Sequence, residues 1–136
     1  NSGFACSIRT SVGSIGYVNQ SYVKGEIVAA ALQNKNGEYV KPSVEAGALA
    51  LNGITLDENL AGTDPNPEAE GAYPIATLTW VLAYETGNGK KTEAVKETFR
   101  KLLSDEYQAK ASRLGYVPLN GDILEKARDA VEKIGK

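Results

Sequence analysis

The sequence predicts a mixed α/β fold, and three observations lead to that prediction. Segments with helix and strand patterns alternate along the 136 residues, an order typical of α/β architectures. One long apolar stretch, Tyr73–Tyr84, has the composition of a strand buried on both faces over part of its length. No other strand of that length accompanies it, and a single strand cannot form a sheet. The strands that pair with it are therefore expected from elsewhere, so the sequence describes part of a larger fold.

The first third of the chain is expected to begin with a helix. Asn1 is a good N-cap residue, and an imperfect apolar pattern continues to about Thr10. Val12-Gly13-Ser14 ends this pattern. Ile15–Val18 then predicts a short buried strand, because β-branched and aromatic residues cluster there. A single helical turn is expected at Ser21–Lys24.

A hairpin and a second helix are predicted next. Asn36-Gly37 is the strongest short hairpin signal, and it is flanked by the apolar segments Glu26–Gln33 and Tyr39–Val40. Pro42-Ser43 opens a helix. The residues expected on its apolar face are Val44, Ala48 and Leu51.

The stretch from Asn52 to Tyr73 is polar and rich in proline and glycine, which predicts a loop and the main boundary of the chain. Its carboxylates lack the alternating spacing of a calcium loop, so a solvated acidic linker is the favoured interpretation. These carboxylates are Asp57, Glu58, Asp64, Glu68 and Glu70.

Helices are predicted over the C-terminal part of the chain. Glu93–Leu103 is strongly amphipathic, and a shorter helix is expected at Glu106–Arg113, ended by Gly115. Asp122 is expected to cap the last helix, with Glu125 completing a capping box. Its inward stripe is predicted to be Ile123, Ala127, Ala130, Val131 and Ile134.

Composition excludes several classes of function. The net charge of −2 argues against a nucleic-acid binder, which needs a cationic surface. The chain has no histidine and one cysteine, Cys6, so His-dependent catalysis, thiolate metal clusters and internal disulfides are not expected. No cofactor is predicted.

Three phrases in order give the chain a family resemblance. Thr10-Ser11-Val12-Gly13-Ser14-Ile15-Gly16-Tyr17-Val18 is similar to "TPGAIGYV", with Val12 in place of the usual proline. Tyr73–Leu82 is similar to "WPITSTTFIL", and Leu114–Leu119 matches "LGYVPL". Together they resemble the C-terminal half of the periplasmic phosphate-binding protein of Pst-type ABC importers.

This resemblance implies a type II periplasmic-binding-protein fold, with two α/β lobes around a ligand cleft, of which this chain is the C-terminal half. Residues 1–72 would complete the second lobe, and residues 73–136 would supply the crossing strand and the C-terminal helices of the first lobe. The implied function is high-affinity capture of inorganic phosphate, without enzymatic activity. The implied partners are the missing N-terminal half and ABC permease subunits. The implied location is periplasmic or extracytoplasmic, with membrane anchoring through a missing N-terminus as an option.

The family's main phosphate-contacting motifs lie upstream of the residues present here, so no ligand is carried over by motif. The candidates from this chain are the helix start Asn1-Ser2-Gly3 and the hydroxyl of Tyr17. Simpler interpretations stay open: a plain N-cap for the first, and a core tyrosine for the second. Arg9 and Arg113 are interpreted as solvated, and Trp80 and Tyr84 as core residues. Alternative functions are a structural fragment that binds nothing alone, a receptor for another oxyanion, or, least favoured, a phosphatase.

Overall fold

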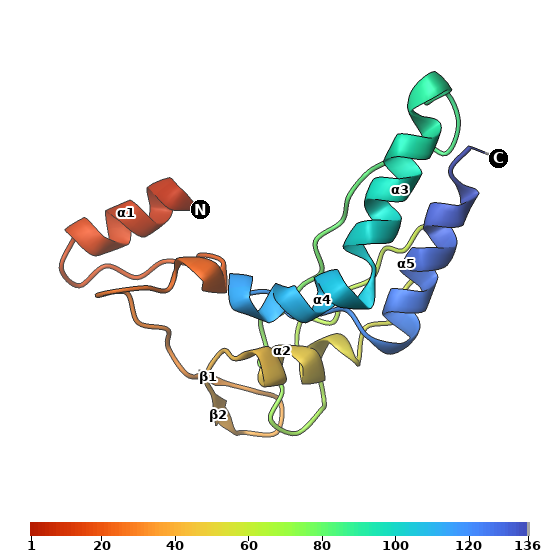
Figure 1. The fold of residues 1–136 in the computed structure, drawn as a ribbon. Coiled ribbons are helices and arrows are strands. Elements are labelled where there is room, and N and C mark those ends of the chain that lie inside the picture. The colour runs from red at the N-terminus through yellow and green to blue at the C-terminus, as the bar shows by residue number, and fades with distance from the viewer. Residues whose placement is uncertain (136) are drawn as a thin grey trace.

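The computed structural model describes residues 1–135, in which helices and a small sheet are joined by long irregular segments (Figure 1). This mixed arrangement agrees with the predicted combination of helices and strands. The elements are α1 (Ser2–Thr10), η1 (Gln20–Tyr22), β1 (Leu32–Gln33), β2 (Tyr39–Val40), α2 (Val44–Leu51), η2 (Gly89–Lys91), α3 (Thr92–Leu102), α4 (Asp105–Ala111), η3 (Ser112–Leu114) and α5 (Gly121–Lys133).

The hairpin forms where Asn36-Gly37 predicts it, but its strands are short. Antiparallel β1 and β2 pair Leu32 with Val40, and Gly37 turns the chain with a φ of 81° that favours glycine. The buried Asn34 accepts hydrogen bonds from the backbone N–H groups of Asn36 and Glu38 at 3.0 and 2.9 Å. Its amide donates to the Glu38 carboxylate at 2.7 Å. This bond, and the bond that the same carboxylate accepts from the Gly71 N–H, hold the pKa of Glu38 below its usual value. Asn34 therefore organises the turn from inside.

The buried face of α2 differs from the predicted one. Ser43 caps the helix, its hydroxyl accepting from the Ala46 N–H at 3.0 Å. The buried residues are Ala46, Gly47, Ala50 and Leu51, whereas Val44 and Ala48, which were expected on the apolar face with Leu51, are only partly buried. Small side chains let other segments approach closely on this face. A Cβ on Gly47 would lie 2.6 Å from a methyl group of Val117.

The core is built partly from the loop after α2. Leu51, Ile54 and Leu56 form the buried cluster, and five partly buried residues pack against it: Leu60, Ala76, Leu78, Val117 and Ile123. Residues 52–72 contain no helix or strand, as predicted, yet they are not simply a solvated linker. Pro67 and Ala72 are almost fully buried too. Local alternation explains this burial, because Ile54 and Leu56 point inward while Thr55 between them is exposed.

Neither of the two predicted buried strands forms within this chain. The predicted strands Ile15–Val18 and Tyr73–Tyr84 have no strand assignment. Among residues 1–135 the Tyr73 N–H bonds to the Ala46 carbonyl at 3.1 Å, but the backbone groups of residues 15–18 and 75–84 make no hydrogen bond to other backbone groups. Most of their large side chains are exposed, including 96% of Ile15 and 96% of Leu82, whereas Leu78 packs against the core. Trp80 and Tyr84, expected in the core, are 44% and 81% exposed. A strand needs neighbours to satisfy its backbone, and the described residues provide none here.

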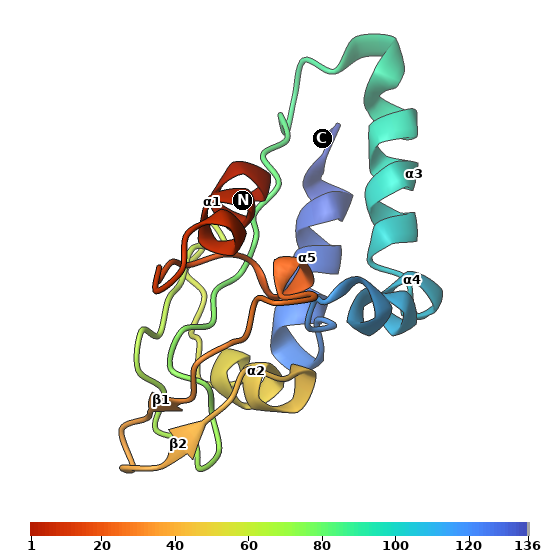
Figure 2. The same cartoon turned by 90° about the vertical axis from the view of Figure 1, so that its left-hand side faces the viewer.

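The C-terminal helices match the prediction closely. In both views α3 and α5 lie side by side, with α4 at their base (Figures 1 and 2). Val131 and Ile134 are buried, and the rest of the predicted α5 stripe is partly buried. The cap is an exception: Asn120, not Asp122, holds the N-cap position, and its side chain makes no capping bond. Asp122 instead lies in the first turn, where a carboxylate favours the helix dipole.

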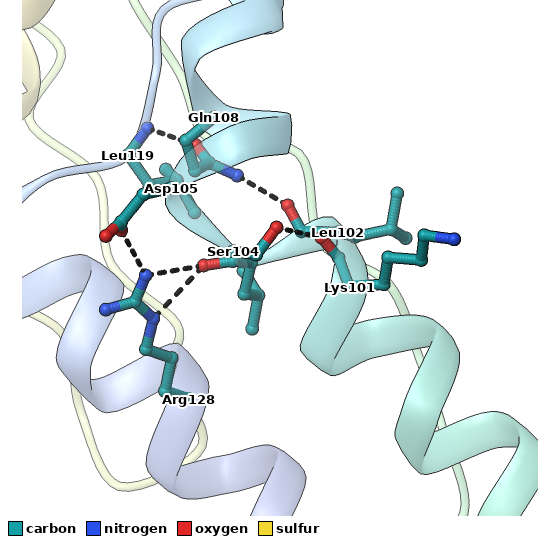
Figure 3. Close-up of polar contacts among 8 residues, drawn as sticks. Lys101, Leu102, Ser104, Asp105, Gln108, Leu119 and Arg128 are labelled. Atoms are coloured by element: carbon teal, nitrogen blue, oxygen red, sulfur yellow. Dashed lines mark hydrogen bonds and ion pairs between the residues drawn. The ribbon is translucent and has the colours of Figure 1, made fainter.

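Polar side chains hold the corner between α3 and α4. Arg128 reaches from α5 to the Leu103 carbonyl, with Nη2 at 2.7 Å and Nε at 3.1 Å, and to the Asp105 carboxylate at 2.7 Å (Figure 3). Gln108 donates to the Leu102 carbonyl at 2.9 Å and accepts from the Leu119 N–H at 2.8 Å. These bonds satisfy carbonyl groups at the end of α3 that the helix itself leaves unpaired. Three helices are thereby fixed at one point.

A second polar link joins α3 and α5 along their length. Arg100 makes a bidentate pair with the Glu132 carboxylate, with both N–O distances at 2.7 Å. Lys96 lies 3.5 Å from the same carboxylate. The hydrogen bonds from Arg100, with the positive charge of both partners, lower the pKa of Glu132 to about 2.

Candidate functional site

The predicted site at the start of α1 has its free amides but lacks the predicted cap. Asn1 occupies the N-cap position, yet its side-chain oxygen accepts from the Asn19 N–H at 3.1 Å and makes no capping bond. The N–H groups of Ser2, Gly3 and Phe4 have no partner inside the helix, because the first bond runs from the Ala5 N–H to the Asn1 carbonyl. Asn1 is therefore the N-cap by position, as one sequence interpretation had it, but its side chain does not cap the helix.

Tyr17 lies near α1 but on a different side from Ser2. Its ring packs against Phe4, with ring centroids 5.2 Å apart and planes tilted by 37°. The side chain is 82% exposed, so the alternative of a buried core tyrosine is not what this chain forms. Tyr17 is absent from the cavity that Ser2 lines. The structure thus brings Asn1, Ser2 and Gly3 together but leaves the Tyr17 hydroxyl apart from the cavity.

A groove lies between α1 and the segment that follows the Ile15–Val18 region. Its main cavity has a volume of about 460 Å³. We call it the α1 groove. Its walls contain two cations, three hydroxyls and two apolar side chains: Arg9, Lys24, Ser2, Ser21, Tyr22, Ala5 and Ile27.

Local structure explains how the two cations reach the α1 groove. Ser2, Ala5 and Arg9 are spaced i, i+3 and i+7, so they share one face of α1. On the opposite wall, the Ile27 N–H bonds to the Lys24 carbonyl at 3.4 Å and closes a turn around Gly25. Gly25 has a φ of 64°, which a glycine adopts without strain.

A smaller cavity of about 260 Å³ adjoins the α1 groove and shares Arg9 and Ile27 with it. Glu26 lines this second cavity, whereas no carboxylate lines the first. Positive charge therefore dominates the α1 groove, and it falls off toward Glu26.

Sequence reasoning set Arg9 aside as solvated and did not single out Lys24 or Ser21. Arg9 is indeed exposed, but it lines the cavity that Ser2 also lines. The shared helical face of Ser2 and Arg9 was a usable signal. The approach of Lys24 depends on the turn at Gly25 and could not be read from spacing alone.

Neither a metal-ligand cluster nor a membrane-spanning helix is found among the described residues. Within residues 1–135 no group of three or more histidine, cysteine or acidic side chains is placed to hold a metal ion. In the same range, none of the helices combines the length and apolar character needed to cross a bilayer.

Comparison with known proteins finds several relatives that share one name. No family model matches it. It is similar to "Phosphate-binding protein PstS" of Methanocaldococcus jannaschii, with 27% identity over 98% of this chain and 38% of that protein. It is 33% identical to the protein of the same name from Xylella fastidiosa strain Temecula1, over 93% of this chain and 35% of that protein. The corresponding protein of Pasteurella multocida is 30% identical over 93% of this chain.

The chain thus spans between 35% and 38% of the length of these curated relatives. They bear names of binding proteins and not of enzymes. Their agreement over nearly all of this chain confirms the resemblance carried by the three sequence phrases: the chain is similar to a portion of the PstS phosphate-binding proteins, consistent with their C-terminal part.

Proposed function

We propose that the protein to which this chain belongs captures inorganic phosphate outside the cytoplasmic membrane and delivers it to an ABC importer. The observation that carries this proposal is the similarity of almost the whole chain to proteins named for phosphate binding.

The proposed architecture is a type II periplasmic-binding-protein fold. Residues 1–72 would complete one lobe, and residues 73–136 would return to the other. Residues 15–18 and 75–84 support this arrangement, because each segment carries strand-forming residues and has no backbone partner strand among residues 1–135. Strands from the remainder of the protein would supply those partners.

The proposed contribution of this chain to phosphate binding is small. A helix terminus contributes roughly 0.3–1 kcal/mol with a charge, whereas micromolar affinity requires about 8 kcal/mol. The free amides of Ser2 and Gly3 therefore cannot hold phosphate tightly by themselves. Most of the ligand contacts would come from the remainder of the protein, with this chain supplying lobe geometry.

Calorimetric titration with phosphate tests the proposed function. The complete protein should bind phosphate with micromolar or better affinity, and the 136-residue chain alone should not. Sulfate, as a second titrant, tests the alternative of another oxyanion. Stronger binding of sulfate than of phosphate, or no binding of either by the complete protein, would contradict the proposal.

The role of Tyr17 is tested by Tyr17→Phe in the complete protein, which removes only the hydroxyl. If the hydroxyl contacts phosphate, the affinity should fall by roughly threefold to tenfold, the loss of one hydrogen bond. Tyr39→Phe is the matched control, because Tyr39 is exposed on the hairpin. An unchanged affinity would remove Tyr17 from the site.

A further inference from the structure

The α1 groove combines features that suit a tetrahedral oxyanion. Arg9 and Lys24 give it two positive charges, and no carboxylate lines it. Within residues 1–135 neither cation takes part in an ion pair. A cleft lined by charge of one sign focuses its field and raises the local concentration of counter-ions.

The groove also contains hydrogen-bond donors beside the charges. Ser2, Ser21 and Tyr22, which carry hydroxyl groups, line the same cavity. The Ser21 backbone is held by a bond from its N–H to the Asn19 side chain at 3.0 Å, and Asn19 is in turn bonded to Asn1. The two walls are thus tied together at one end of the groove. Its volume of about 460 Å³ lies in the range of small-molecule pockets.

From these features we propose that the α1 groove is a second, weaker oxyanion site, with Arg9 and Lys24 as its charged ligands. It shares Ser2 with the helix start considered for the tight site, and Arg9 and Lys24 distinguish it from that site. Exposure of both cations to solvent keeps the affinity low, because water and salt screen their charge. The groove would gather phosphate on the surface of the receptor. The choice of phosphate as the ligand rests on the proposed function. The inference of an oxyanion site rests on the residues that line the α1 groove.

The experiment measures phosphate bound per molecule of the complete protein by equilibrium dialysis, from micromolar to millimolar phosphate at low ionic strength. The unmodified protein should show a tight phase of one phosphate per molecule and a second phase at millimolar concentration. Arg9→Gln and Lys24→Gln should each abolish the second phase and leave the tight phase intact.

Lys41→Gln is the matched control, since Lys41 is exposed and lies outside the groove. It should retain both phases. Saturation of the unmodified protein at one phosphate per molecule would overturn the proposal. So would loss of the second phase in Lys41→Gln, which would indicate binding to surface charge in general. A weakened tight phase in Arg9→Gln would also overturn it, because the groove would then be part of the main site. Absence of the tight phase in the unmodified protein would instead contradict the proposed function.

Discussion

The C-terminal helices and the apolar segment that leads into them differ in where their backbone groups find partners. Helices α3, α4 and α5 satisfy most of their backbone internally, and Arg128 and Gln108 bond to carbonyl groups at the end of α3. Residues 75–84 are richer in large apolar side chains, yet their backbone makes no bond to other backbone groups within residues 1–135.

The difference shows that the apolar content of a segment does not by itself decide whether its backbone N–H and C=O groups are paired. A helix pairs its N–H and C=O groups with residues four positions away, so it needs only a surface to pack on. A strand pairs with residues distant in sequence and cannot form when those residues are elsewhere. Residues 75–84, the most apolar stretch of this chain, therefore form no regular secondary structure, whereas the amphipathic segments form helices.

The largest expected effect tests whether residues 75–84 become a buried strand in the complete protein. Val81 is 68% exposed in this chain. In the complete protein, Val81→Asp should cost on the order of 3–5 kcal/mol in the free energy of unfolding, because an uncompensated charge would be buried. Urea denaturation gives this value.

Thr86→Asp is the control for that change, since Thr86 is exposed in the turn just after the segment. It should change the free energy of unfolding by no more than about 0.5 kcal/mol. Equal effects of the two substitutions would show that Val81 stays exposed in the complete protein.

A moderate effect is expected at the corner between α3 and α4, where Arg128 bonds to the end of α3. Arg128→Met keeps much of the aliphatic stem but removes the bonds to Leu103 and Asp105. Because the Arg128 side chain is 43% exposed, the expected loss is about 1–2 kcal/mol in the free energy of unfolding. Lys126→Met on the same helix, at an exposed position, is the control. A similar loss in both variants would show that the corner adds no specific stability.

The smallest effect concerns the pH dependence of the link between α3 and α5. Arg100 and Lys96 lower the pKa of Glu132 to about 2, below its value of about 4.3 in an unfolded chain. As the pH falls, the Glu132 carboxylate therefore takes up a proton in the unfolded state before it does so in the folded state. The stability from this pair is fully present above about pH 4.3 and is lost as the pH drops toward 2.

Glu132→Gln should flatten this part of the acid-unfolding profile, measured as melting temperature against pH. Glu125→Gln, which alters an exposed carboxylate on the same helix, should keep the profile of the unmodified protein. Identical profiles for Glu132→Gln and the unmodified protein would show that the ion pair adds nothing measurable.

The sequence predicted local elements well and their surroundings less well. The hairpin at Asn36-Gly37, the helix that Pro42-Ser43 opens and the stripe of α5 all depend on residues close in sequence, and all three form. The buried face of α2 was only partly predicted because Val117, far along the chain, packs against Gly47. The burial of Ile54 and Leu56 was missed because the loop around them is polar.

At the candidate site, too, the sequence predicted features that depend on neighbouring residues but not those that depend on distant residues. Ser2 could be named from its place at a helix start, and its shared face with Arg9 follows from helical spacing. The pairing of that face with Lys24 required the turn at Gly25 to place a second wall beside α1. Asn1 was expected to cap its own helix, but its side chain bonds to Asn19 across the loop.

The sequence by itself determined the helices, the hairpin turn and the family resemblance, because each depends on the order of neighbouring residues. Only the tertiary structure decided which apolar residues are buried and which charges meet in the α1 groove. The physical reason is that burial and charge proximity are properties of segments brought together in space. For residues 15–18 and 75–84, the strand partners are not among the residues that the structure describes.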